Sequence, residues 1–366
     1  MIRSFRYRLY PSKSQANKIK SFFNYTAFLY NCALEHRIVM WNQWGKHTNY
    51  YDQARSITEL RKIDSGVSLL NYSVCQETLK RLDRAFNKFY KGIRDKSKVG
   101  FPRFKGENSV SSITFPTYGD GIKLIDKKLY IQNIGNISVR LHRSITGSIK
   151  TVCIKRAGGK YYASFLCDNV EKRVFRKTKL QVGIDVGIKK FAALSNGQTI
   201  KNPKHFNKKL KEIKLAASKF HKNKTTKNRT KLSKLYSKVY NQRKDFLHKT
   251  SLSIVKKFGY IFIEDINFKN ILYGNTKVLK REISAAAWGT FFDMLFYKAE
   301  EAGRVIAKVN PCNTTKICSA CGAIVEKTLS ERKHICKCGY TEDGDINAAI
   351  NILRIGQGLC FKQEAA

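Results

Sequence analysis

Positive charge is the strongest constraint on this chain. Its 366 residues carry 70 Lys and Arg against 27 Asp and Glu, which gives a formal net charge of +43. A compact chain with this charge repels itself unless a polyanion neutralises it. Because 42% of the residues are hydrophobic and 12% are aromatic, the chain can build packed cores, and we do not expect intrinsic disorder.

The sequence favours a nucleic acid over a membrane as that polyanion. Residues 1–8 lack the apolar run of a secretory signal, and no stretch approaches the ~18 apolar residues that a membrane-spanning helix needs. We therefore expect a cytoplasmic protein of the cytosol or nucleoid, with no membrane partner. A structural RNA-binding protein stays open as an alternative at this point.

Hydrophobic periodicity predicts a small β-barrel interrupted by a helical layer. Apolar and basic residues alternate over residues 1–10, as in a half-buried strand. Apolar residues recur at helical spacing within 13–41 and 68–92. The segments that follow have the pattern of strands, at 121–142, 149–156 and 160–167.

The second half of the chain has a different pattern. Residues 180–200 predict two strands joined by a turn. Residues 201–250 hold 17 Lys and Arg and only two acids, with enough apolar residues for a pair of long helices. We interpret this segment as a helical arm that follows a phosphate backbone rather than as a solvated coil. Two further strands are expected at 260–266 and 304–310, and one amphipathic helix is expected at 284–303.

Three acids interrupt otherwise apolar segments of this second half. Asp185 lies inside a predicted strand, Glu264 ends another, and Asp345 opens a helix. A carboxylate at a buried strand position is costly unless a positive group compensates it. Mg²⁺ is one such group, since it takes carboxylate oxygens as ligands. Each acid alone could instead cap a turn, end a strand or cap a helix.

Four cysteines near the C-terminus have the spacing of a zinc ribbon. Cys318 and Cys321 form a Cys-x2-Cys pair, and Cys336 and Cys338 follow fourteen residues later. Four thiolates suit a closed tetrahedral site for structural Zn²⁺. Cytosolic thiols stay reduced, so we do not expect disulfides. Because the second pair is Cys-x-Cys, His334 and Cys312 stay open as alternative ligands.

The acidic segments resemble the three motifs of the RuvC-type nuclease core. They are Gly-Ile-Asp-Val-Gly at 183–187, Ile-Glu-Asp at 263–265 and Asp-Gly-Asp-Ile-Asn-Ala-Ala at 343–349. In this order they resemble most closely the TnpB family, the insertion-sequence-encoded RNA-guided DNA endonucleases related to type V CRISPR effectors. The resemblance spans nearly the whole chain and includes Phe-Arg-Tyr-Arg-Leu-Tyr-Pro at 5–11, Gly-Phe-Pro-Arg-Phe-Lys at 100–105, Arg-Lys-Asp-Phe-Leu-His-Lys at 243–249 and Ala-Ala-Trp-Gly at 286–289.

The resemblance implies a transposon-encoded enzyme, a Mg²⁺-dependent endonuclease that cuts DNA next to a short flanking motif. It implies that Asp185, Glu264 and Asp345 bind two Mg²⁺ ions, or Mn²⁺ in their place, and that Arg332 steadies the cleaved phosphate. Their neighbours Asp265 and Asp343 are the residues most easily confused with them. A nuclease-inactive, RNA-guided DNA-binding repressor is the alternative.

The resemblance also implies nucleic-acid partners. These are a guide RNA from the end of the mobile element and double- and single-stranded target DNA, bound by a monomer that leaves sequence choice to base pairing. By alignment with the family, five residues approach the flanking motif: Tyr51, Tyr72, Ser73, Gln76 and Thr117. Gln76 could pair with adenine in the major groove.

The expected architecture is α/β plus β-barrel. An RNase H-like (RuvC) nuclease core with a zinc ribbon follows an oligonucleotide-binding-like β-barrel wedge that carries a helical insert. The expected domains are a wedge at 1–10 and 106–175, a helical recognition domain at 11–105, a nuclease domain at 176–310 and 340–366 with a helical insert at 201–257, and a zinc ribbon at 311–339.

Overall fold

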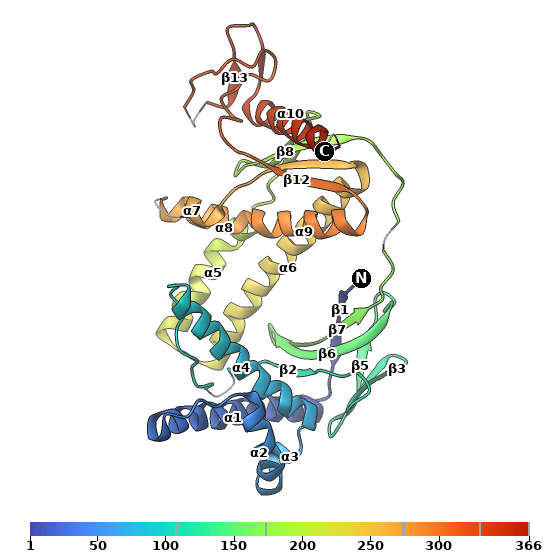
Figure 1. Ribbon diagram of the computed structural model, residues 1–366, viewed down its shortest axis with the longest axis vertical. Helices are drawn as coiled ribbons and strands as arrows, with labels where there is room; N and C mark the ends of the chain where they lie inside the picture. The colour runs from blue at the N-terminus through green and yellow to red at the C-terminus, as the bar shows by residue number, and fades with distance from the viewer. Residues whose placement is uncertain (107–108, 173, 273–274, 329–330, 365–366) are drawn as a thin grey trace. The chain divides into compact units, whose positions relative to one another are not determined.

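The computed structural model describes residues 1–106, 109–172, 174–272, 275–328 and 331–364 (Figure 1). The chain divides into two compact units, Met1–Glu171 and Lys172–Ala366. The first contains β1 to β7 and α1 to α4, and the second contains β8 to β14 and α5 to α10.

The first unit contains a seven-stranded antiparallel sheet in the order β2-β6-β7-β1-β5-β4-β3. Its long strands curve strongly, so that the sheet forms a near-closed barrel (Figure 1). β1 pairs with both β7 and β5, which places the start of the chain in the middle of the sheet. The strand bounds are β1 (Arg3–Tyr10), β2 (Ser112–Phe115), β3 (Ile122–Ile125), β4 (Lys128–Ile131), β5 (Gly135–Arg140), β6 (Ser148–Ala157) and β7 (Lys160–Asp168).

A helical layer connects β1 to β2 and shares one hydrophobic core with the barrel. Leu34 of α1 and Leu82 of α4 belong to the same buried cluster as Phe5 and Phe165 of the sheet. The expected strand and helices are confirmed, but the helix expected from residue 68 begins only at Tyr72, because Asn71 caps it. The helices are α1 (Lys13–Trp44), α2 (Tyr50–Ile63), α3 (Ser65–Ser68) and α4 (Tyr72–Arg94).

The second unit contains a five-stranded sheet in the order β10-β9-β8-β11-β12. β8, β11 and β12 run parallel to one another, and β9 runs antiparallel to both of its neighbours, β8 and β10. The central strands β8 and β11 contain buried runs such as Ile261–Ile263, as expected for strands covered on both faces, whereas the edge strand β12 is partly exposed. The strand bounds are β8 (Gln181–Val186), β9 (Lys190–Leu194), β10 (Thr199–Lys201), β11 (Tyr260–Glu264) and β12 (Val305–Val309).

Helices cover the two faces of this sheet. On one face, Leu247 of α6 and Phe291 of α9 pack with Ile261 and Ile263 of β11. On the other face, Ile352 of α10 packs with Phe262, the residue between them. The pair of long helices expected within 201–250 is confirmed. The helices are α5 (His205–Lys222), α6 (Thr226–Lys257), α7 (Phe268–Leu272), α8 (Lys277–Ala286), α9 (Trp288–Glu301) and α10 (Gly344–Glu364).

The helix expected over 284–303 is confirmed as α9, but it begins only at Trp288. The chain has two helices there, because Ala287 takes a left-handed backbone conformation with φ of 55° between α8 and α9.

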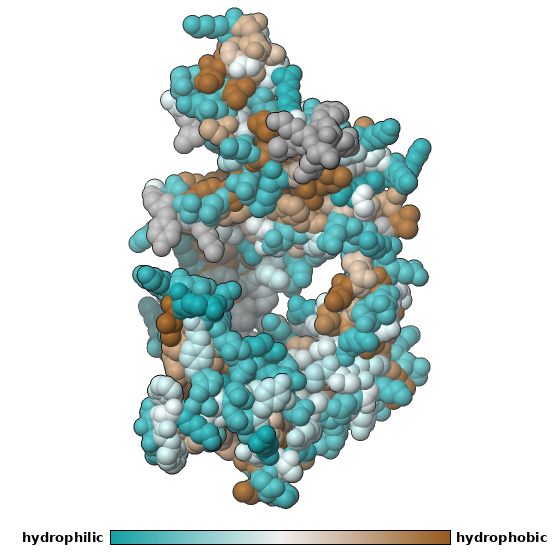
Figure 2. All heavy atoms as spheres, viewed as in Figure 1, coloured by the Kyte–Doolittle hydropathy of each residue, from teal (hydrophilic) through white to brown (hydrophobic). Residues whose placement is uncertain are grey.

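After β12, a loop leads to the short hairpin of β13 (Lys333–Ile335) and β14 (Thr341–Asp343), which carries the second cysteine pair. Hydrophilic residues cover most of the face shown in Figure 2.

Glycine lets α10 lie directly against β8. A Cβ atom added at Gly183 would lie 2.1 Å from the carbonyl oxygen of Ala349 in α10. We therefore predict that Gly183→Ala lowers the free energy of unfolding by about 1–3 kcal/mol, the usual cost of overpacking. Gly358→Ala is the control, because a Cβ atom there meets open space on the same helix. Urea unfolding measures both variants, and equal midpoints would contradict the close approach.

Candidate functional site

Two parallel strands and one helix bring the predicted acidic residues together. Ile263 pairs with Ile184, so that Glu264 and Asp185, the next residues, reach the same carboxyl edge of the sheet. That edge is where open α/β sheets bind ligands. Asp345 lies in the first turn of α10, which packs against β8. We call Asp185, Glu264 and Asp345 the acidic cluster.

Burial and neighbouring negative charge act on the Asp185 carboxylate. Burial raises the pKa of Asp185 well above its usual value, and the charges of Glu264, Asp345 and Asp343 raise it further. Burial also raises the pKa of Glu264, which is 9% exposed. The Thr314 hydroxyl donates a hydrogen bond to Glu264 and partly opposes that rise. A buried carboxylate with other acids beside it favours a bound cation.

Basic side chains surround the acidic cluster. Lys190 Nζ lies 2.5 Å from Asp343 Oδ2 and 4.0 Å from Asp345 Oδ2. Arg332 Nη1 lies 4.0 Å from Asp345 Oδ1, so the predicted arginine does reach the cluster. Burial lowers the pKa of Lys327, and the nearby charges of Asp345 and Asp185 partly oppose that change.

Asp343 and Asp265, the acids next to the acidic cluster in sequence, each pair with a lysine. Burial tends to raise the pKa of Asp343, but the Lys190 ammonium outweighs it and lowers that pKa below its usual value. Asp343 also accepts the Asp345 backbone N–H at 3.1 Å. Asp265 is more exposed and pairs with Lys308 at 2.9 Å. Asp343 therefore borders the cluster, whereas Asp265 is held by a lysine of β12.

The sequence did not reveal three residues of this region: Lys190, Lys327 and Thr314. The predicted turn after Asp185 could have indicated Lys190. The chain turns back there, and β9 pairs antiparallel with β8, so the first residues of β9 lie close to the end of β8. Thr314 contacts Glu264 across fifty residues of sequence, and no local pattern indicates that contact.

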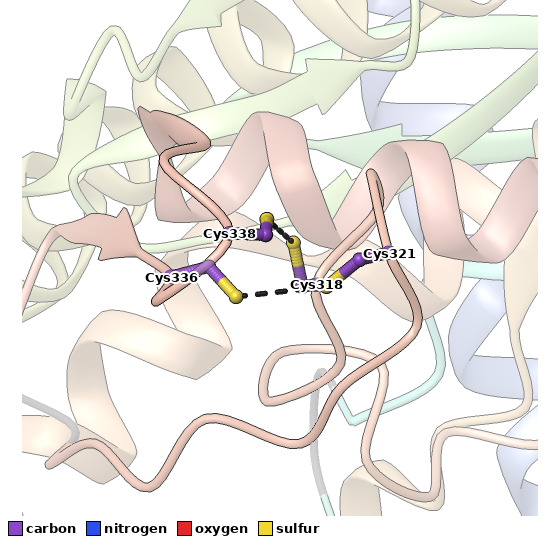
Figure 3. Close-up of side chains that lie close together, drawn as sticks. All are labelled: Cys318, Cys321, Cys336 and Cys338. Atoms are coloured by element: carbon purple, nitrogen blue, oxygen red, sulfur yellow. Dashed lines mark hydrogen bonds between the residues drawn. The ribbon is translucent and has the colours of Figure 1, made fainter.

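The four cysteines form a metal-binding cluster (Figure 3). Their sulfur atoms all lie within 4.8 Å of one another, and among the described residues they are the group placed for a single metal ion. The Sγ–Sγ distances are 3.8 Å for Cys318–Cys338 and 3.6 Å for Cys321–Cys336. A tetrahedral zinc site with Zn–S bonds of about 2.3 Å has sulfur atoms about 3.8 Å apart. The cluster therefore fits structural zinc, whereas the acidic cluster is not gathered around one point in this way.

Both cysteines of the Cys-x-Cys pair belong to the metal-binding cluster, so no other side chain is needed to complete four ligands. Cys336 and Cys338 both belong to the group, whereas Cys312 and His334 do not. Glycine allows the tight turns, because Gly322 and Gly339 have φ values of +80° and +87°. Their backbone N–H groups donate to the carbonyl oxygens of Cys318 and Cys336.

The thiols of the metal cluster differ in acidity. Burial raises the pKa of Cys318, but backbone N–H groups of Cys321 and Ala320 more than offset it and lower the value to about 6. At Cys338, a hydrogen bond from the Tyr340 backbone lowers the pKa, but the neighbouring Cys321 and Cys336 thiols raise it to about 12. A bound metal would remove this difference, because it binds all four sulfurs as thiolates.

Most of the predicted DNA-reading residues lie around the N-terminal end of α4, whereas Tyr51 follows Tyr50, whose ring contacts Lys80 farther along α4. Tyr72, Ser73 and Gln76 belong to its first turns, and Tyr51 lies at the start of α2, which packs against α4. Thr117 is exposed in the turn after β2. Asn71 joins α4 to that turn, since its side chain donates to Asp120 at 2.9 Å.

The five residues differ in exposure. Tyr51 and Tyr72 are exposed, and Gln76 is half-buried. Ser73 is only 8% exposed, and its hydroxyl donates to Asn71 Oδ1. Ser73 therefore fixes the helix N-terminus in this structure rather than presenting a free hydroxyl.

Comparisons with known proteins match the chain from end to end. Three family models cover successive parts of it: an OrfB_IS605 "Helix-turn-helix domain" at 1–46, the OrfB_IS605 "Probable transposase" at 164–273 and the "Cas12f1-like, TNB domain" at 288–352. The last range includes both cysteine pairs and Asp345. The matches define a class, the OrfB proteins of IS605-type transposons.

Relatives that align with nearly the whole chain identify its family. A "Putative RNA-guided DNA endonuclease" of Streptomyces pristinaespiralis is 30% identical and covers 97% of this chain and 89% of the relative. "Putative RNA-guided DNA endonuclease InsQ" of Escherichia coli is 26% identical, over 98% of this chain and 93% of the relative. The chain belongs to the TnpB family.

Solved structures and membrane topology add two findings. A cryo-EM structure of the Cas12f1-sgRNA-target DNA complex matches over 96% of this chain and 99% of that chain, with a TM-score of 0.36 and 16% sequence identity. Among the described residues, no helix combines the length and apolar character needed to cross a bilayer.

The metal cluster predicts a specific zinc requirement. We expect one zinc ion per chain, and we expect Cys318→Ser to lose it because one of four thiolates is removed. The control is Cys312→Ser, since Cys312 is exposed and lies outside the group. Elemental analysis of the purified proteins measures the zinc. Full zinc retention by Cys318→Ser would contradict the site.

Proposed function

We propose that this chain is an RNA-guided, Mg²⁺-dependent DNA endonuclease of an insertion sequence, with the acidic cluster as its active site. The observation that carries the proposal is the electrostatic coupling of Asp185 to Glu264 and Asp345 at the carboxyl edge of parallel strands. The net charge of +43 supports binding of RNA and DNA backbones. Relatives named as RNA-guided DNA endonucleases support the activity.

The domain assignment is part of the proposal. The sheet order and the mixed strand directions of the second unit support an RNase H-like core, with α5 and α6 as the helical insert at 201–257. The barrel of the first unit would be the wedge and α1 to α4 the recognition insert. The boundaries proposed are those given above, with the zinc ribbon at 311–339.

Mg²⁺ fits the donor set, because the three acids offer the hard carboxylate oxygens that this ion prefers. Two bound ions would activate the attacking water and stabilise the leaving oxygen. The chain's own residues hold the acids: β8 carries Asp185, β11 carries Glu264, and the Thr314 hydroxyl fixes the Glu264 carboxylate. Arg332, with five guanidinium donors, would bind the phosphate beside Asp345.

The target DNA would be read in two ways. Base pairing with the guide RNA would select the sequence. The N-terminal end of α4 with Tyr72 and Gln76, the turn with Thr117 and the start of α2 with Tyr51 would contact the flanking motif. Ser73 would contribute by holding Asn71, which joins α4 to the turn that carries Thr117.

The first test is cleavage of a target-bearing plasmid by the protein with its guide RNA. We expect Asp185→Ala to lower cleavage by about 10²-fold or more, since metal-bound charge stabilisation is worth several kcal/mol. Asp265→Asn is the matched control, because that exposed acid pairs with Lys308. RNA binding should be unchanged in both variants. Unimpaired cleavage by Asp185→Ala would remove Asp185 from the active site, and a wild-type chain that binds its target without cutting would indicate the repressor.

The second test uses stability rather than activity. The folded state holds a proton on Asp185 that the unfolded state releases above about pH 4, so this residue lowers stability progressively as pH rises toward its raised pKa. In Mg²⁺-free buffer, we expect Asp185→Asn to raise Tm at pH 7 and to change it little at pH 4. For a unit of this size, each kcal/mol corresponds to about 2–4 °C. Added Mg²⁺ should raise the wild-type Tm more than that of the variant; an equal rise would contradict metal binding there.

A further inference from the structure

A cavity in the first unit takes no part in the acidic cluster or the zinc site. It has a volume of about 380 Å³ and lies where the C-terminal parts of α1 and α4 meet the loop at 45–49 and Phe101. This volume lies in the range of sites that hold small organic ligands. All residues that line it belong to the described part of the chain.

Aromatic rings form much of the cavity wall. Phe101 meets Phe86 edge-to-face with ring centroids 5.4 Å apart, and it meets Phe89 in the same way at 5.3 Å. Tyr90 stands beside Phe89 at 5.6 Å. Trp41 is 62% exposed at the rim. Phe86 belongs to the buried core, but Trp41, Tyr90 and Phe101 are exposed, and exposed aromatic side chains gathered at one cavity are typical of a binding surface.

One buried polar group in the cavity has no partner. Thr48 is only 6% exposed, and its hydroxyl makes no hydrogen bond in the structure. A buried hydroxyl without a partner is unfavourable, and a ligand with a polar edge would satisfy it. Thr48 therefore places an unsatisfied hydroxyl next to the aromatic wall.

The charges around the cavity favour an anionic ligand. Arg37 is already engaged, because it donates to Gln53 at 2.8 Å and to Asp83 at 3.1 Å. Lys46 and His47 are exposed in the loop, and none of the described residues that line the cavity is acidic. A planar ring system joined to a phosphate has both properties that this cavity recognises.

We propose that the cavity binds one unpaired nucleotide of a single-stranded nucleic acid. The base would stack between Trp41 and the aromatic wall, its polar edge would bond to the Thr48 hydroxyl, and Lys46 would contact a phosphate. Base–aromatic stacking accepts any base, so the site would recognise an unpaired nucleotide without selecting its sequence. This inference does not depend on the nuclease proposal, since it concerns binding in the other unit.

The test measures binding of the full-length protein to short oligouridylate RNA and to the matching oligodeoxyuridylate DNA, each with its bases or as an abasic backbone. We expect Trp41→Ala to weaken binding of at least one base-bearing strand by about 5- to 100-fold and to leave abasic binding unchanged. Thr48→Val, which removes only the hydroxyl, should cost about 2- to 10-fold. Trp44→Ala is the matched control, since Trp44 is 63% exposed and lies outside the cavity.

The strand affected identifies the source of the nucleotide. A base-dependent loss on RNA alone assigns the cavity to RNA, a loss on DNA alone assigns it to DNA, and a loss on both assigns it to either strand. If Trp41→Ala and Thr48→Val bind all four strands as Trp44→Ala does, the proposal is overturned. Cleavage by these variants is not part of the readout, so failure of the nuclease proposal would leave this result interpretable.

Discussion

The burial of carboxylates at one sheet edge is the constraint around which the candidate site of the second unit is built. Burial raises the pKa of Asp185, and the charges of Glu264 and Asp345 raise it further. The unit keeps them there because parallel pairing of β8 with β11 fixes two of the acids and a glycine at 183 lets α10 bring the third. Lys190 and Arg332 offset part of the negative charge. A site arranged in this way gains stability when a cation binds it.

The zinc site and the acidic cluster are connected through the segment that joins them. Thr314, which bonds to Glu264, lies just before Cys318. Asn351 of α10 donates to the carbonyl oxygens of Thr314 and Ile317, and Asn347 accepts the Ser319 backbone N–H. Metal binding by the cysteines would therefore order the same loop that positions the Glu264 carboxylate, which gives a structural ion an effect on the neighbouring site.

The distribution of charge explains how one chain can hold both an acidic site and a basic surface. Ion pairs such as Lys249–Asp245 and Lys62–Glu59 are exposed and contribute little to stability. With 70 basic and 27 acidic residues, most Lys and Arg have no acid available to pair with. Phosphate groups can neutralise this excess, and the aromatic cavity adds stacking to that electrostatic attraction.

The sequence by itself determined the features that local spacing encodes. The cysteine pairs predicted the metal-binding cluster because two cysteines one or two residues apart can bind the same ion, and the acids at 185, 264 and 345 stood out against apolar neighbours. Only the tertiary structure decided which side chains meet across long separations: Thr314 bonds to Glu264, Lys190 pairs with Asp343, and Thr48 lines the same cavity as the aromatic rings. The sequence also did not predict the break between α8 and α9 at Ala287. Hydrophobic periodicity indicates which residues are buried and does not indicate where the backbone turns.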